Sequence, residues 1–207
     1  MSTPSPKKST ARRRGPILII AAVLAVIGGL GLGLLVPVSK PNLPVSQSIV
    51  GGPFEMVNHR GETVTEDTFK GRHMLVYFGY TFCPDVCPTE LQAMTVALND
   101  LGAKADAITP VFVTIDPERD DVEAMRTYVS FFHPRLIGLT GTPAQVKAMT
   151  DAFGVYAARA RDTGSSSDYL MDHSSMIFLM DEDGRYVTHF RAGTAPEAMA
   201  RQLAAAL

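Results

Sequence analysis

The sequence lacks several features that would identify a common class of protein. Its 207 residues include no tryptophan and only two cysteines. A structural disulfide framework spreads cysteines along the chain to join distant loops, and one close pair does not fit that pattern. No internal repeat is present, and the only low-complexity tract is the short serine run 165–167. With 46% hydrophobic and 19% charged residues, the composition is that of one globular domain with an appendage.

Acidic residues are missing from the first 38 positions, where Lys7, Lys8 and the arginines 12–14 precede the uncharged stretch Pro16–Val38. This stretch exceeds the ~20 apolar residues that cross a bilayer. The positive-inside rule then predicts a cytoplasmic basic tail at 1–15, a transmembrane anchor at 16–38 and an exported remainder on the periplasmic or an equivalent side. A cleaved signal peptide is the alternative, but its apolar core would be ~7–15 residues long and end at a small-residue cleavage site.

The exported part is acidic. All 21 Asp and Glu residues lie after position 38, with 14 of the 19 Lys and Arg, so this part has a formal net charge of −7 with histidine neutral. An acidic domain has no electrostatic footprint for nucleic acid. It could attract a basic partner, although charge alone gives no specificity.

The Pro- and Ser-punctuated segment 39–48 is predicted to be a tether, and 49–207 to be one domain. Apolar runs and helical spacing predict its elements. They are a hairpin of Phe54–Val57 with Glu62–Val64, strands at Met74–Phe78, Val111–Ile115 and Leu136–Leu139, helices from Pro88 and at Val122–Phe132, Pro143–Phe153 and Ala195–Leu207, and a second hairpin of Met176–Met180 with Tyr186–Phe190. Strands that alternate with helices predict an α/β fold, and the last hairpin makes the sheet mixed.

Both cysteines lie in the motif Cys83-Pro84-Asp85-Val86-Cys87-Pro88, directly after a predicted buried strand. Because proline disfavours helical geometry in the residue before it, we expect both cysteines in a turn, with Cys87 at or near the N-cap of a helix that begins at Pro88. Glu90 could complete a capping box. The helix end favours a Cys87 thiolate, whereas Asp85 and Glu90 oppose it.

Three interpretations of the pair remain open from the residues alone. A dithiol–disulfide switch suits an exported, oxidising compartment. A soft-metal site is natural too and is the favoured interpretation, because thiolates bind Cu(I), Zn or iron–sulfur clusters. A static disulfide would close a loop of only five residues, where the entropic stabilisation is smallest.

A metal site would need a further ligand. His173 is the best candidate, because it lies between a Gly/Ser loop and the apolar strand Met176–Met180, where binding residues often occur. Asp172 could orient its ring, and Met171 is a candidate additional ligand. The remaining histidines are expected to be solvated or at the edge of the core: His59, His73, His133 and His189.

Three stretches together resemble the Sco/SenC family of membrane-tethered copper proteins. They are Tyr77–Pro88, Val113–Asp120 and Asp172–Ser174, and the similarity covers about residues 49–207. The resemblance implies a thioredoxin-like fold with an added hairpin. It also implies one copper ion, as Cu(I) and in some states Cu(II), bound by Cys83, Cys87 and His173.

The same resemblance implies a role in assembling the copper A site of cytochrome c oxidase subunit II, by copper delivery or by thiol–disulfide exchange on that subunit. Another copper carrier or a thiol reductant would then be a further partner. The alternative is a thiol–disulfide oxidoreductase that uses Cys83 and Cys87 without metal. A peroxidase of peroxiredoxin type is not favoured, since its nucleophile motif does not precede Cys83.

Two neighbouring groups complete the sequence predictions. The segment Asp116–Asp120 is predicted to be a turn at the end of a strand, with Asp120 as the N-cap of the next helix. It could also lie near the site and touch a partner. Tyr80 and Phe82 are expected to shield the site and to shape a docking surface.

Overall fold

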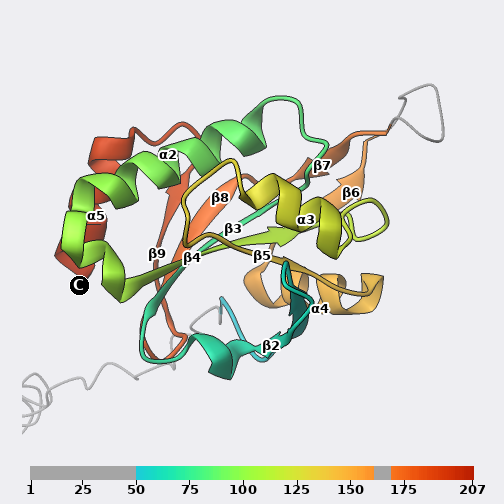
Figure 1. Cartoon of the computed structure of the whole chain (residues 1–207), viewed down its shortest axis with the longest axis horizontal. Coiled ribbons are helices and arrows are strands. Elements are labelled where there is room, and N and C mark those ends of the chain that lie inside the picture. Colours follow the sequence, from blue (N-terminus) through green and yellow to red (C-terminus); the bar gives the residue numbers. More distant parts are fainter. Residues whose placement is uncertain (1–49, 161–168) are drawn as a thin grey trace, which may run out of the picture. The chain divides into compact units, whose positions relative to one another are not determined.

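Figure 1 shows the computed structural model of the chain, which describes residues 50–160 and 169–207. The predicted basic tail, anchor and tether lie outside the described residues. None of the helices that are described combines the length and the hydropathy that a bilayer crossing requires. Ser46–Leu207 forms one compact unit, which contains both described ranges.

The elements follow the predicted order with four additions, the strands β6 and β7 and the 3₁₀ helices η1 and η2. The strands are β1 (Glu55–Asn58), β2 (Thr63–Thr65), β3 (His73–Gly79), β4 (Ile108–Thr114), β5 (Ile137–Thr140), β6 (Ala157–Arg159), β7 (Met171–His173), β8 (Met176–Met180) and β9 (Tyr186–Arg191). The helices are α2 (Val86–Leu101), α3 (Val122–Val129), α4 (Pro143–Phe153) and α5 (Pro196–Ala206), with 3₁₀ helices η1 (Glu66–Phe69) and η2 (Gly102–Ala107). The predicted mixed α/β architecture is confirmed.

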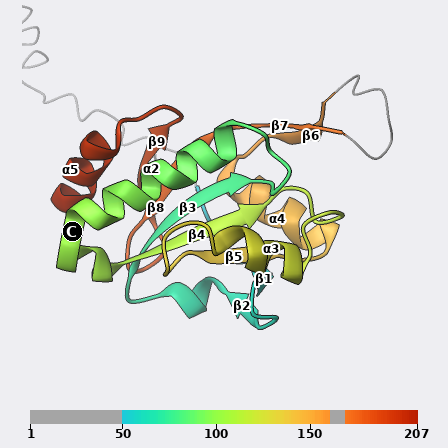
Figure 2. The same ribbon diagram turned by 45° about the horizontal axis from the view of Figure 1, so that its top comes forward.

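Seven strands form one sheet in the order β2-β1-β5-β4-β3-β8-β9. The central neighbours β3, β4 and β5 are parallel, and the flanking pairs are antiparallel. Both predicted hairpins, β1–β2 and β8–β9, are present at the sheet edges. In Figures 1 and 2, α2 and α5 lie together over one face of the sheet and α4 lies on the other.

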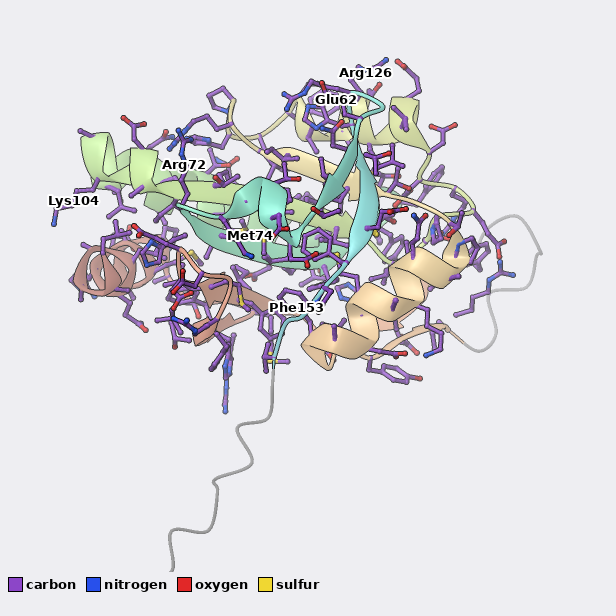
Figure 3. All side chains as sticks on the ribbon, turned by 90° about the horizontal axis from the view of Figure 1, so that it is seen from below. Glu62, Arg72, Met74, Lys104, Arg126 and Phe153 are labelled. Carbon is purple, nitrogen blue, oxygen red and sulfur yellow. The ribbon has the colours of Figure 1, made fainter. Side chains whose placement is uncertain are left out.

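The central strand β3 is buried along its whole length and divides the core by its alternation. Tyr77 stacks near Phe112 on the side of α2, whereas Phe78 packs near Phe153 on the side of α4. Figure 3 shows the lower side, where Met74 and Phe153 lie on the side that carries η1 and α4. Because parallel strands β3, β4 and β5 end at one edge, the loops that come after them meet there.

Helix α2 begins at Val86, two residues before the predicted start at Pro88. Cys87 therefore lies in the first helical turn, and the N-cap position belongs to Asp85. Pro88 is tolerated because the first four N–H groups of a helix have no intrahelical acceptor. The prediction that Cys87 avoids helical geometry is thus wrong, although Cys87 does lie near the N-cap, two residues after Asp85.

Two acidic residues that were predicted to cap helices have other partners. Glu90 is buried, and its Oε1 accepts a hydrogen bond from the backbone N–H of Gly193 at 2.7 Å. The N-cap of α3 is Asp121, which accepts from the N–H of Ala124 at 2.8 Å. Asp120 is fully buried and instead binds Thr81 in the loop before Cys83.

Candidate metal and thiol site

The two cysteines lie where the chain passes from β3 to α2. Cys83 is in the loop after Gly79, and its backbone N–H bonds to the carbonyl of Tyr80 at 3.2 Å. Cys87 comes one helical turn later. Strand β7, which ends at His173, passes beside this loop in both views of Figures 1 and 2. The topology thus brings together residues that are 86 positions apart.

The two thiols are free and close to each other. Cys83 is 9% exposed and Cys87 is fully buried. The backbone N–H of Cys87 donates to Cys83 Sγ at 3.4 Å. On its other side, Cys87 Sγ lies 3.6 Å from His173 Nε2. Cys87 therefore contacts both other members of the predicted set, Cys83 through its backbone N–H and His173 through its sulfur.

His173 is held in the tautomer that leaves its inner nitrogen free. Its Nδ1 lies 3.2 Å from the carbonyl oxygen of Ser174. Since a carbonyl oxygen only accepts, Nδ1 carries the proton, and Nε2 of the neutral ring presents a lone pair toward Cys87. Burial lowers the pKa of His173, although the Ser174 hydrogen bond and Asp172 act in the opposite direction. A neutral imidazole with one free nitrogen is the form that binds a metal.

The surroundings keep Cys87 protonated in the absence of a cation. Burial raises the pKa of the Cys87 thiol, and hydrogen bonding with Cys83 adds to the effect. The helix end, which favours a thiolate, is therefore outweighed. Burial also raises the pKa of the neighbouring Tyr77 hydroxyl, and the nearby Cys87 adds to the rise. A positive charge at this place would stabilise the thiolate that burial now disfavours.

Gly79 makes room for the Cys87 sulfur. A Cβ at this position would lie 2.8 Å from Cys87 Sγ and 2.9 Å from Phe112 Cε2. Neither distance is compatible with ordinary van der Waals contact. The glycine at the end of β3 thus allows the first turn of α2 to approach the sheet closely.

The donor set fits a soft metal ion. Two thiols and one imidazole nitrogen are the ligands that Cu(I) prefers, and carboxylates, which hard cations need, do not take part. Within residues 50–160 and 169–207, no three His, Cys, Asp or Glu side chains already stand in the arrangement of a metal site. Binding a metal through all three predicted residues therefore requires a side-chain adjustment around Cys87.

Three other residues that were predicted near the site lie close to the cysteines or to His173. Tyr80 is buried, with its ring centroid 6.2 Å from that of His173, so it shields the site as expected. Phe82 is 59% exposed beside Cys83 and forms part of the surface. Met171 is half-buried and lies two residues before His173 in β7, on the same side of the strand.

Asp172 does not orient the ring as expected, because it is exposed and the Ser174 carbonyl bonds the ring nitrogen. The remaining histidines have roles elsewhere. His59 Nδ1 accepts from the N–H of Gly138, and His133 Nδ1 accepts from the N–H of Arg135. His189 Nδ1 contacts the Tyr186 hydroxyl, and His73 is buried at the start of β3.

The sequence analysis allowed that the loop after β4 could lie near this site, but it did not predict the contacts that join the two. Asp120 accepts hydrogen bonds from the N–H and the hydroxyl of Thr81, at 3.0 and 2.6 Å, and from the hydroxyl of Thr114 at 2.6 Å. Burial raises the pKa of Asp120, and these hydrogen bonds partly offset the rise. Arg119 lies against the aromatic residues that flank Cys83. The only signal in the sequence was a cluster of charges directly after an apolar strand.

Comparison with known proteins now gives the family. The model of the SCO1/SenC family matches residues 44–207. The chain belongs to this family. An SCO2-like protein of Rickettsia conorii is 39% identical over 191 residues, which cover 88% of this chain and 93% of the relative. The human mitochondrial SCO2 homologue is 38% identical over 197 residues, covering 89% of this chain and 74% of the relative.

A solved structure is similar over nearly its whole length. ScoI of Bradyrhizobium japonicum, solved with copper bound, is 42% identical and superposes with a TM-score of 0.71. The alignment covers 76% of this chain and 99% of that one. The thioredoxin-like Sco fold that the sequence resemblance implied is therefore confirmed.

Proposed function

We propose that this SCO1/SenC protein binds one copper ion through Cys83, Cys87 and His173. The observation that carries the proposal is the 3.6 Å approach of His173 Nε2 to Cys87 Sγ, with the ring held by Ser174 so that Nε2 is free. An imidazole placed in this way beside a buried thiol has no evident structural purpose that a hydrophobic residue would not serve better. The copper-bound state of the related ScoI supports the choice of metal.

Cu(I) suits the three-ligand set, because thiolate and imidazole donors satisfy a soft ion of low coordination number. Cu(II) would need an additional ligand, for which Met171 is the candidate within β7. Both cysteines must be reduced for binding, so copper loading and disulfide formation exclude each other.

We further propose that the domain delivers this copper to the copper A site of cytochrome c oxidase subunit II, or prepares that site's thiols. Transfer is reasonable from a site near the surface, because Cys83 is slightly exposed and an incoming thiolate could replace one protein ligand at a time. Pro16–Val38 would hold the domain at the outer side of the membrane, with the N-terminus in the cytoplasm.

Copper titration of the reduced domain tests the ligand set, with His173→Ala as the main variant. Loss of a direct ligand should lower the affinity by more than the about 10–100-fold that is typical when a residue that only orients a ligand is lost. Copper-edge absorption spectroscopy should show two sulfur ligands in both proteins and lose a nitrogen in the variant. His59→Ala, which removes an imidazole from the β1–β2 turn, is the matched control and should bind like the wild type. Wild-type affinity in His173→Ala would refute the site.

The second candidate function is thiol–disulfide exchange without metal. The 3.4 Å hydrogen bond from the Cys87 N–H to Cys83 Sγ supports this candidate, because it brings the two residues into contact. The Cys83 thiolate would attack a substrate disulfide, and the Cys87 thiolate would resolve the mixed disulfide, so that two substrate thiols form as one protein disulfide is made. Exchange that survives in His173→Ala, in a protein that retains no copper, would favour this function over copper delivery.

A further inference from the structure

The loop between β4 and α3 contains the charged segment Asp116–Asp120, to which the proposed copper site assigns no role. Although charged, this segment is largely buried: Asp116 is 3% exposed, Asp120 is fully buried, and the Arg119 side chain is 15% exposed. Burying charged groups is costly unless they are paired and hydrogen-bonded. The groups that pair with these buried charges therefore indicate which part of the structure the segment stabilises.

One side of the segment holds the cysteine loop. The Asp120 carboxylate accepts hydrogen bonds from both the N–H and the hydroxyl of Thr81, two residues before Cys83. It also accepts from Thr114 at the end of β4, and its own carbonyl accepts from the Thr140 hydroxyl at the end of β5. Asp120 thus ties the loop before Cys83 to the ends of two core strands.

Arg119 supports the same loop through aromatic rings. Its guanidinium carbon lies 4.7 Å from the ring centroid of Phe82 and 5.7 Å from that of Tyr80. Both distances are within the range of a cation–π interaction, which is stronger where the cation is shielded from water. Arg119 therefore also fixes the positions of Tyr80 and Phe82, the residues on either side of Thr81.

The other side of the segment holds the chain that enters β7. Arg119 stacks on the ring of Tyr169 at 3.7 Å, and its Nη1 donates to the Tyr169 carbonyl at 2.9 Å. Asp116 accepts from the Tyr169 hydroxyl at 2.7 Å and also from Arg119 Nε. Tyr169 precedes β7, the three-residue strand that ends at His173.

The cysteine loop and the chain that enters β7 thus both contact the Arg119 side chain. Among the described strands, β7 pairs only with the short β6 and lies outside the seven-stranded sheet, so the sheet itself does not fix its distance from the cysteine loop. Arg119 contacts both sides directly. Asp116 pairs with Arg119, and Asp120 holds the cysteine loop through Thr81. We propose that Asp116, Arg119 and Asp120 form a clamp that positions His173 relative to Cys83 and Cys87, an inference that rests on the proposed copper function.

The variant Arg119→Lys tests the clamp while keeping the charge. Lysine lacks the planar group that stacks on Tyr169 and donates hydrogen bonds to two acceptors, so it cannot replace arginine here. Arg119→Lys should lower copper affinity by about tenfold or more, as for other residues that orient metal ligands. Copper-edge spectra should show the nitrogen contribution of His173 weakened and both sulfur ligands kept.

The second readout needs no copper. In the apo protein, amide hydrogen exchange should become faster in residues 80–87 and 169–174 and stay unchanged in the strands β3 and β4. A residue with a purely structural role would instead change exchange through the whole core. Arg126→Lys is the matched control, because Arg126 on α3 bonds Glu123 and the His59 carbonyl and lies near Glu62 at the hairpin (Figure 3). The control should keep the wild-type values.

If Arg119→Lys does not fold, Tyr169→Phe replaces it, since that change removes only the hydroxyl that bonds Asp116. The clamp is wrong if either copper affinity or local exchange stays at the wild-type value. If the wild-type protein binds no copper at all, the proposed function fails, and hydrogen exchange in the apo protein then decides on the clamp by itself.

Discussion

Gly79→Ala should damage both the packing and the proposed copper site, although it adds a single methyl group. Gly79 lies in the extended strand β3, so its backbone conformation does not exclude alanine. The added Cβ would lie 2.8 Å from Cys87 Sγ and 2.9 Å from Phe112 Cε2. Overpacking of a core by one methyl group typically costs about 1–3 kcal/mol of unfolding free energy. Neither neighbour can move freely, since the sulfur is on a short side chain in a helix and the ring is buried.

The stability loss should be visible in thermal unfolding of the apo domain. For a domain of this size, each kcal/mol lowers Tm by roughly 2–4 °C. The sulfur of Cys87 must also shift, and ligand positions need to be held within about 0.5 Å for good binding. We therefore expect copper affinity to fall by about tenfold or more in a competition titration.

Gly138→Ala provides the matched control. Its Cβ would lie 2.9 Å from Val129 Cγ1 and 3.1 Å from Met125 Cε, so it creates a similar overlap in β5, between the sheet and α3. The control should lose a similar amount of stability but keep the wild-type copper affinity. The reasoning is refuted if Gly79→Ala unfolds at the wild-type Tm, or if the two variants lose copper affinity equally.

The charges and the exposure of single residues give two further predictions. Burial lowers the pKa of His59, His133 and His173 below the usual 6.5, so below that pH the unfolded chain binds more protons than the folded domain. The unfolding free energy of the apo domain should therefore fall as the pH drops through about 6.5; equal urea midpoints at about pH 7.5 and 5.5 would contradict this. The second prediction concerns thiol reactivity: a maleimide should modify Cys83 before Cys87, because Cys87 is fully buried and its thiol pKa is raised. Peptide mapping by mass spectrometry measures the order, and equal rates would contradict it.

The fold was largely predictable because its central elements carry strong local signals. The buried strand at β3 is a continuous apolar run, and α4 begins with a proline and a capping box, so its bounds Pro143–Phe153 were predicted correctly. The β8–β9 hairpin was marked by Asp181-Glu182-Asp183-Gly184 between two apolar runs. Such signals act over a few residues, which is the range that a single sequence can resolve.

The missed features depend on contacts between distant segments. The strands β6 and β7 have only three residues each, too few for a periodic pattern, and they pair across residues 161–168. The N-cap of α3 was placed one residue early, because Asp120 and Asp121 are equivalent in sequence and only Asp120 meets Thr81. The helix start at Val86 was missed because Pro88 marks a first turn without fixing which residue of that turn it occupies.

In the candidate site, too, local signals were predictable from the sequence and contacts between distant segments were not. The motif made Cys83 and Cys87 candidates from residue type and spacing. The position of His173 before an apolar strand made it the best third candidate, and the family resemblance strengthened that choice. Sequence could not show that Cys87 is the member that faces both of the others. It also could not show that Arg119 contacts the loop of one cysteine and the strand of the histidine, since those contacts span 37 and 50 positions.

The burial of Cys87 favours metal binding over free thiol exchange as the main use of this pair. A cysteine that works as a nucleophile is usually exposed, with a lowered pKa. Cys87 has neither property, because it is fully buried and its pKa is raised. A copper ion between Cys87 and the free Nε2 of His173 would supply the positive charge that the thiolate lacks, so that binding releases the proton that burial retains. Any thiol exchange would then have to begin at Cys83, the more exposed member, while copper is absent.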